Sequence, residues 1–143
     1  MQARLSRPAG VRSLALLEVF TAVLLLVIGF LLVDFAILGF TGGAGLFGFG
    51  AVEFLLGLLS LAGTAGLWMG KAWSWILTIV FSAIAILVNV ALLAIAATYT
   101  LTVLYPGGPI VLLIIANDII IAEMAVVYFL SKPNIKSYLG RST

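Results

Sequence analysis

The sequence contains no cysteine and no histidine, and only 8% of its 143 residues are charged. Without thiolate and imidazole, zinc sites, iron–sulfur clusters, haem held by His or Cys, and Cys or His nucleophiles lose their usual groups. We therefore expect no metal site and no cofactor, and we predict that the protein is not an enzyme. The absence of cysteine also leaves the redox compartment open, because there is no disulfide to interpret.

The shortage of charge indicates what surrounds the chain. A soluble domain needs about 25% charged residues to cover its surface, whereas this chain is 64% hydrophobic, with a mean hydropathy of +1.34. We therefore expect a lipid bilayer around it. The seven basic residues outnumber the five acidic ones, but they are scattered and lack the clustering and the interleaved aromatics of a nucleic-acid site. We expect no nucleic-acid partner.

Four apolar stretches are long enough to cross a hydrocarbon core of roughly 30 Å. They cover residues 14–33, 51–69, 72–97 and 109–130. The first exceeds the apolar region of a signal peptide, about 7–15 residues, and no cleavage signal follows it, so we interpret it as a retained helix. The third is longer than needed and should tilt or protrude. We predict one all-α membrane domain over residues 1–143, a bundle of four antiparallel helices.

The connections between these stretches differ in length and composition. Residues 39–50 contain so much glycine that we expect a mobile loop at the membrane surface rather than a helix. Only Gly70 and Lys71 separate the second and third spans, which predicts a tight hairpin. Pro109 suits the first turn of the fourth helix, and Lys132-Pro133 should end it.

Every basic residue falls on one side of the predicted membrane: before the first span, at Lys71, or after the fourth span. We therefore predict a multi-pass protein of the cell membrane. The positive-inside rule places both of its termini in the cytoplasm. Tryptophans gather around the Lys71 turn, as in an aromatic belt. We expect these residues to anchor the cytoplasmic side: Arg12, Lys71, Trp73, Trp75 and Lys132.

Three segments carry a resemblance to a known group of proteins. They are Arg7-Pro8-Ala9-Gly10-Val11 leading to Glu18, the turn Gly66-Leu67-Trp68-Met69-Gly70-Lys71-Ala72-Trp73-Ser74-Trp75, and the tail Lys132-Pro133-Asn134-Ile135-Lys136-Ser137-Tyr138-Leu139-Gly140-Arg141. With these segments the whole chain resembles small four-span integral membrane proteins of archaea and bacteria whose function is uncharacterised. The resemblance implies four spans in a prokaryotic cell membrane and implies no activity.

Acidic and amide side chains within the spans are the candidate functional residues, because each acid costs about 2.5–3.5 kcal/mol of apparent insertion free energy near a helix centre. They are Glu18, Asn89, Asn117, Asp118 and Glu123. From the helical rise, Asn117 and Asp118 lie about 12–14 Å from the outer face, with Asn89 within a turn or two of them. Glu18 and Glu123 lie roughly 9 Å from the cytoplasmic face. The sequence thus predicts a central group and a separate glutamate pair.

Two interpretations of these groups remain open. Carboxylates and amides inside a membrane serve proton relays and cation sites. Alternatively, the asparagines join helices by hydrogen bonds, Asp118 is protonated, and the glutamate pair is neutralised by snorkelling Arg12 or Lys71. Asp118 and Glu123 lie about 140° apart on their helix, so they cannot both face one narrow pore.

Two further acids, Asp34 and Glu53, lie near the outer ends of the first two spans. We expect both to reach water as solvated charges at the interface. A calcium site built from the pair is the alternative, although two carboxylates fall short of the usual six to eight oxygen ligands.

Small residues on the second span suggest close helix packing, inside the bundle or between subunits: Gly57, Ala62, Gly63, Gly66 and Gly70. Gly70 could instead only end the helix. The hydroxyl groups of Ser74, Thr78 and Ser82 would need a neighbouring general base to act as nucleophiles, and no His or basic residue lies at their depth in the membrane. We therefore interpret them as packing residues.

The leading functional hypothesis is a non-enzymatic membrane subunit that associates through its helices with itself or with a larger membrane complex. A chain with costly intramembrane acids is most simply understood when neighbouring helices satisfy them. The alternative is a small oligomeric proton- or cation-coupled transporter or channel that uses Asp118, Glu123 and Glu18.

Overall fold

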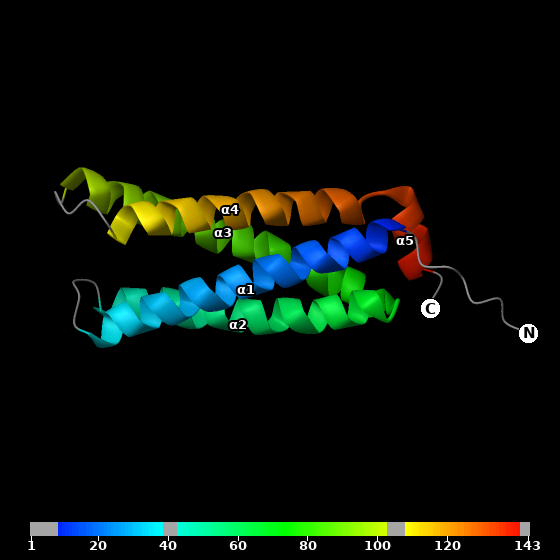
Figure 1. Ribbon diagram of the computed structural model, residues 1–143, viewed down its shortest axis with the longest axis horizontal. Coiled ribbons are helices and arrows are strands. Elements are labelled where there is room, and N and C mark those ends of the chain that lie inside the picture. Colours follow the sequence, from blue (N-terminus) through cyan, green and yellow to red (C-terminus); the bar gives the residue numbers. More distant parts are fainter. Residues whose placement is uncertain (1–8, 39–42, 103–107, 141–143) are drawn as a thin grey trace, which may run out of the picture.

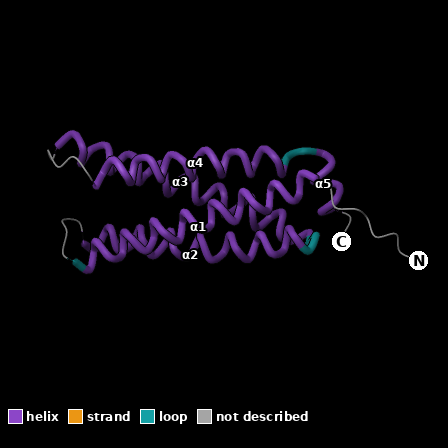
Figure 2. Tube along the Cα trace, viewed as in Figure 1, coloured by secondary structure: helices purple, strands orange, loops and turns teal. Residues whose placement is uncertain are grey.

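The computed structural model describes residues 9–38, 43–102 and 108–140. These residues form five helices and no strand: α1 (Ala9–Ile37), α2 (Gly43–Trp68), α3 (Ala72–Thr102), α4 (Gly108–Leu130) and α5 (Pro133–Gly140). Figure 2 shows that short loops and turns join these helices. The first four helices contain segments of 28, 26, 27 and 21 residues that are long and apolar enough to cross a membrane. The prediction of an all-α chain with four such helices is confirmed.

The four long helices form a ring in which each packs on two neighbours. α1 lies along α2, and α4 lies along α3, while α1 also contacts α4 and α3 also contacts α2. In Figure 1, α3 crosses the bundle obliquely from the α2 side to the α4 side. The core therefore lies on the axis that all four helices share.

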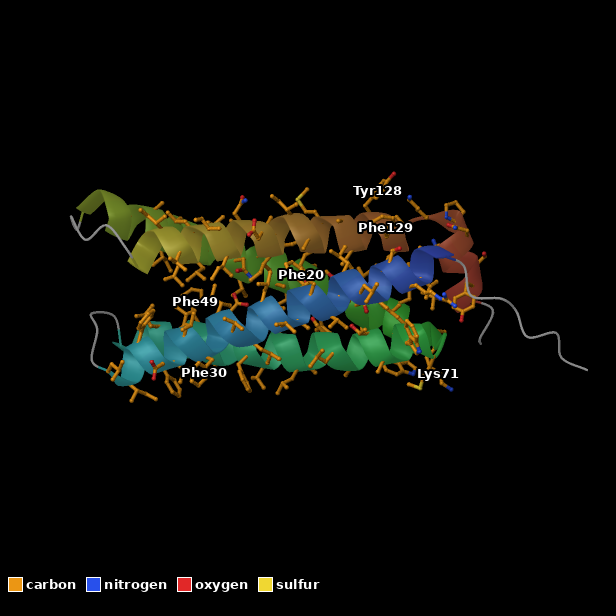
Figure 3. The ribbon with its side chains drawn as sticks, viewed as in Figure 1. Phe20, Phe30, Phe49, Lys71, Tyr128 and Phe129 are labelled. Carbon is orange, nitrogen blue, oxygen red and sulfur yellow. The ribbon has the colours of Figure 1, made fainter. Side chains whose placement is uncertain are left out.

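The buried residues of each helix recur at intervals of three and four, which is one face of an α-helix. On α1 this face carries Val11, Leu14, Glu18, Leu25, Ile28 and Leu32. The opposite faces are also apolar, with Phe20 and Phe30 among the exposed side chains, and Figure 3 shows these faces covered by carbon-rich side chains. A helix that is hydrophobic all round needs lipid or protein on every side.

The connection between α2 and α3 is a glycine-ended turn at the end of the bundle that also carries α5. The Lys71 amide donates to the carbonyl of Gly66 at 2.9 Å, and the Gly70 amide donates to that of Leu67 at 3.1 Å. This pair of bonds is the Schellman motif, which requires a left-handed residue, and Gly70 has φ of 68°. Of the two roles considered for Gly70, the structure therefore supports that of ending α2.

The expected glycine-rich loop over residues 39–50 is wrong for the part that the structure describes, because α2 begins at Gly43. Close packing accounts for Gly50, the last glycine of this segment. An added Cβ on Gly50 would lie 2.8 Å from the carbonyl oxygen of Gly29, and one on Gly29 would lie 2.6 Å from the backbone nitrogen of Phe54. Glycine thus lets α1 and α2 touch backbone to backbone, which outweighs its weak helix propensity. Residues 39–42 lie outside the described residues.

The short helix α5 was not expected from the sequence. α4 ends at Leu130 as predicted, but Pro133 then occupies the first turn of a new helix, where its missing N–H is not needed. Ile135 and Leu139 on α5 are buried against the ends of α1 and α4. α5 therefore covers one end of the bundle (Figure 1).

Candidate functional site: a buried polar layer

The bundle interior holds a group of buried polar side chains contributed by all four long helices. Glu18 on α1, Glu53 on α2 and Glu123 on α4 are 2%, 0% and 1% exposed. The third helix, α3, supplies neutral groups of equally low exposure. We call the following residues the interior polar layer: Glu18, Glu53, Thr78, Ser82, Asn89 and Glu123.

Helix geometry places these groups inside. Thr78, Ser82 and Asn89 follow one another at intervals of four and seven residues, which keeps them on one face of α3. Glu18 and Glu123 lie on the same buried faces as the leucines, isoleucines and valines before and after them. The acids are therefore held inside by the helix packing and not by a loop.

The carboxyl groups of the layer lie close enough to interact electrostatically. Glu123 interacts in this way with both Glu18 and Glu53. The Asn89 side chain lies beside the Glu53 carboxyl, and the Ser82 hydroxyl lies beside that of Glu123, but neither contact meets hydrogen-bond geometry. Three acids thus share one interior with amide and hydroxyl groups as their nearest polar neighbours.

Most polar atoms of the layer have no hydrogen-bonding partner among the described residues. These atoms are both carboxyl oxygens of Glu53 and Glu123, Oε2 of Glu18, Oδ1 of Asn89, and the hydroxyl oxygens of Thr78 and Ser82. The Nδ2 group of Asn89 donates to the carbonyl of Ala85 at 2.9 Å. Buried polar atoms are nearly always paired in folded proteins, so this concentration of unpaired acceptors marks the layer as the candidate site.

Two apolar clusters enclose the layer. The first consists of Leu25, Ile28, Leu32, Leu56, Ala85, Leu92, Ala116 and Ile119. The second, at the α5 end, consists of Val11, Leu14, Leu67, Val126, Leu130, Ile135 and Leu139. Along α1, Glu18 lies between Leu14 of the second cluster and Leu25 of the first, while Glu53 and Asn89 lie beside the first cluster. The layer is therefore an enclosed site and not an open channel.

The predicted central group of Asn89, Asn117 and Asp118 is not brought together. Asn89 is fully buried, but Asn117 and Asp118 are exposed on the outer face of α4. The reason is the direction of the helix: the buried face of α4 passes through Ala116, Ile119 and Glu123, which leaves positions 117 and 118 outside. The predicted pair of Glu18 and Glu123 does come together in the layer.

Glu53 was expected to reach water, and this expectation is wrong, because the residue is completely buried. Its position is set by the face of α2 that also buries Gly57, Ser60 and Leu67. Glu53, Ser60 and Leu67 repeat every seven residues, which is the signal that could have placed the acid inside. Asp34 is half-buried near the end of α1.

One of the two open interpretations has snorkelling Arg12 or Lys71 neutralise the glutamate pair, and it finds no support at Glu123. Both basic side chains are exposed, and neither oxygen of Glu123 has a partner among the described residues. Other cations near the α5 end lie against aromatic rings: the Nζ atom of Lys132 is 4.6 Å from the centre of the Phe129 ring, and that of Lys136 is 5.5 Å from the Trp75 ring.

The predicted anchors lie near one end of the bundle. Trp75 donates from Nε1 to the carbonyl of Leu130 at 3.3 Å, which ties α3 to the end of α4. Trp73 is 46% exposed, and Figure 3 shows Lys71 at the tip of the α2–α3 turn.

The small residues of α2 serve two different neighbours. Gly57 faces Ala22 and Leu26 of α1, whereas Gly63 and Gly66 face Thr78 and Ser74 of α3. Ala62 is exposed and takes no part in this packing.

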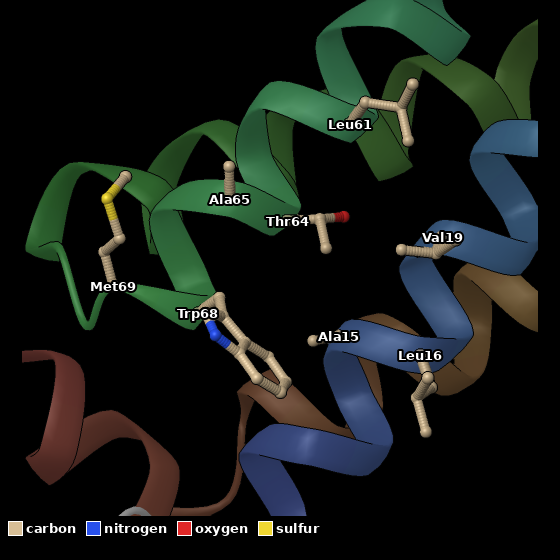
Figure 4. A pocket seen from close by; sticks show the side chains of 8 residues that line it. All are labelled: Ala15, Leu16, Val19, Leu61, Thr64, Ala65, Trp68 and Met69. Atoms are coloured by element: carbon tan, nitrogen blue, oxygen red, sulfur yellow. The ribbon is translucent and has the colours of Figure 1, made fainter.

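A groove of about 380 Å³ lies on the outside of the bundle between α1 and α2. It is lined by Ala15, Leu16, Val19, Leu61, Thr64, Ala65, Trp68 and Met69 (Figure 4). Its single hydroxyl, on Thr64, donates to the carbonyl of Ser60 at 2.9 Å. The groove therefore offers no free polar group for chemistry, and the interior polar layer remains the candidate site.

Comparison with known proteins gives no relative on which to base a function: no family model, no curated protein and no solved structure matches this chain.

Proposed function

We propose that this protein is a non-enzymatic integral membrane subunit that associates with a second copy of itself through the outer face of α4. The observation that carries this proposal is the exposure of Asn117 and Asp118 on that face. Position 118 is about 15 Å from the start of α4, deep in the hydrocarbon region of a spanning helix. A charged or amide side chain is costly there unless another helix supplies its hydrogen bonds.

The rest of this face supports a helix–helix contact. Exposed residues recur along α4 at intervals of three and four, and we call the set the α4 stripe: Ile114, Asn117, Asp118, Ile121, Met124 and Tyr128. Figure 3 shows Tyr128 pointing away from the bundle. One polar pair within an apolar stripe at this spacing is the arrangement that sets register between packed helices.

The polar pair favours a second copy as the partner. Asn117 and Asp118 lie on either side of the centre of the stripe, because successive residues turn by about 100°. A two-fold axis along the membrane normal would place the Asn117 amide of one copy opposite the Asp118 carboxylate of the other, and the reverse contact follows by symmetry. The amide can donate and the carboxylate can accept, so the stripe complements itself.

The proposal includes a position in the cell. We propose that the four helices cross a prokaryotic cell membrane in antiparallel order with both termini in the cytoplasm. The positive-inside distribution of basic residues and the exposed apolar faces support this arrangement. The end of the bundle that carries α5 and the α2–α3 turn, with Lys71, Lys132 and Lys136, would face the cytoplasm.

Mass measurement in mild detergent tests the proposed association. We expect the wild-type protein to run as two chains, and the double variant Asn117→Leu with Asp118→Leu to run as one, since an apolar stripe is as well solvated by lipid as by protein. Asp34→Leu removes an acid elsewhere and should leave the dimer intact. If one chain is found with an equimolar amount of a different membrane protein, that protein and not a second copy is the partner. A wild-type monomer would contradict any association through α4.

A further inference from the structure

We propose that the interior polar layer is a proton-binding site, in which Glu18, Glu53 and Glu123 hold protons and Asn89 and Ser82 are their hydrogen-bonding partners. This inference is independent of the α4 stripe, because the layer faces the bundle axis and Asp118 faces outward.

The inventory of donors and acceptors at Glu53 indicates a proton. Its two carboxyl oxygens and Oδ1 of Asn89 are all acceptors, and none of them has a donor. The amide group of Asn89 is already directed to the Ala85 carbonyl. A proton on Glu53 supplies the missing O–H, which donates to Asn89 Oδ1 and pairs two buried groups at once.

The second half of the layer follows the same rule. Glu18 and Glu123 are buried carboxyls that interact with each other, and two close carboxyls do not both ionise readily. With a proton on each carboxyl, the O–H of one can donate to the other, and the Ser82 hydroxyl can donate to the carbonyl oxygen of Glu123.

The interior polar layer contains acids but no basic side chain, and this composition favours a proton as its ligand. α1, α2 and α4 each direct one acid to the interior, and α3 directs no ionisable residue there. The described basic side chains lie at the surface or against aromatic rings. Among the described residues, no three His, Cys, Asp or Glu side chains are grouped closely enough to hold a metal ion. Uncompensated buried carboxylates are expensive, and protonation removes the charge without a ligand cage.

The buried hydroxyls of α3 suggest from which end protons would reach the enclosed layer. On α3 the hydroxyl residues Ser74, Thr78 and Ser82 lead from the Lys71 turn toward Glu123 over a rise of about 12 Å. Beyond Asn89 the buried residues of the same helix are Leu92 and Ala96. Protons would therefore enter and leave through the end with α5, and the first apolar cluster would prevent their passage to the other side.

Infrared difference spectroscopy of the full chain in lipid nanodiscs tests the site. At neutral pH we expect a carbonyl band of protonated carboxylic acids that decreases in Glu18→Gln or Glu123→Gln and in Glu53→Gln. Asp34→Asn, which changes a half-buried acid outside the layer, should leave the band unchanged. Circular dichroism and the mass in detergent confirm that each isosteric variant is folded.

Three results would overturn the proposal. The first is a band that none of the three Gln variants reduces. The second is a band that disappears when sodium, potassium or calcium is added at constant pH, since it would identify a metal cation as the ligand. The third is a sustained proton flux across vesicles under a pH gradient that Glu123→Gln abolishes, which would replace one-sided binding with transport.

Discussion

Ser137 lies on the exposed side of α5 and offers a direct way to test which side of the membrane this end of the bundle faces. Its hydroxyl donates to the carbonyl of Asn134 at 3.1 Å, and the chain contains no cysteine. In Ser137→Cys the new thiol is the sole target, and all basic residues that set orientation are kept. We expect a membrane-impermeant maleimide to label it only after cells are permeabilised.

Leu38→Cys is the matched variant at the opposite end of α1, where the side chain is 65% exposed. We expect it to be labelled in intact cells. Labelling of Ser137→Cys from outside would contradict the proposed cytoplasmic termini.

Single residues also show how far the sequence can place a site. The acids could be counted from the sequence, and the pairing of Glu18 with Glu123 followed from their depths. Glu53 and Asp118 were misplaced because depth along a helix does not say which face is buried. In an apolar helix the polar–apolar contrast between faces is weak, so the direction of the interior depends on small residues and on neighbouring helices.

At the scale of elements, the closest contact is between α1 and α2. A methyl group on Gly29 would lie 2.6 Å from a backbone atom of Phe54, which cannot move without shifting the helix. We expect Gly29→Ala to lower the free energy of unfolding in detergent by at least about 1–3 kcal/mol, the usual cost of overpacking.

Gly45→Ala, on the same helix pair, is the control for this substitution. Among the described residues outside the adjacent turn of its own helix, no atom lies within 4 Å of a Cβ added there. Alanine favours helix over glycine by up to about 1 kcal/mol. Its stability should be equal to or above that of the wild type. Equal stability of both variants would refute the close backbone contact.

The elements themselves were predictable where the apolar runs are long, and less so where glycine and proline occur. The four long helices follow from hydropathy, because a chain in lipid must satisfy its backbone groups internally. The same constraint extends α2 through Gly43, Gly45 and Gly48, where the low helix propensity of glycine in soluble proteins would predict a loop. Proline at position 133 was correctly expected to follow a helix end, but it also begins α5.

The bundle as a whole has two polar sites, one facing its axis and one facing its surroundings. The interior polar layer is closed by apolar clusters, and its acids have no described basic partner. The α4 stripe presents its polar pair to the surroundings. In this account the stripe joins two copies while the layer binds protons within each copy, so association and protonation can be measured separately.

Disulfide cross-linking of single-cysteine variants in native membranes tests whether two copies pair through α4. Ile121 lies at the centre of the stripe and is 59% exposed, while Leu87 on α3 is 69% exposed and lies outside it. Oxidation should convert Ile121→Cys to a species of twice the mass and leave Leu87→Cys as a single chain. Equal cross-linking of the two variants, or no cross-linking of Ile121→Cys, would rule out pairing through the α4 stripe.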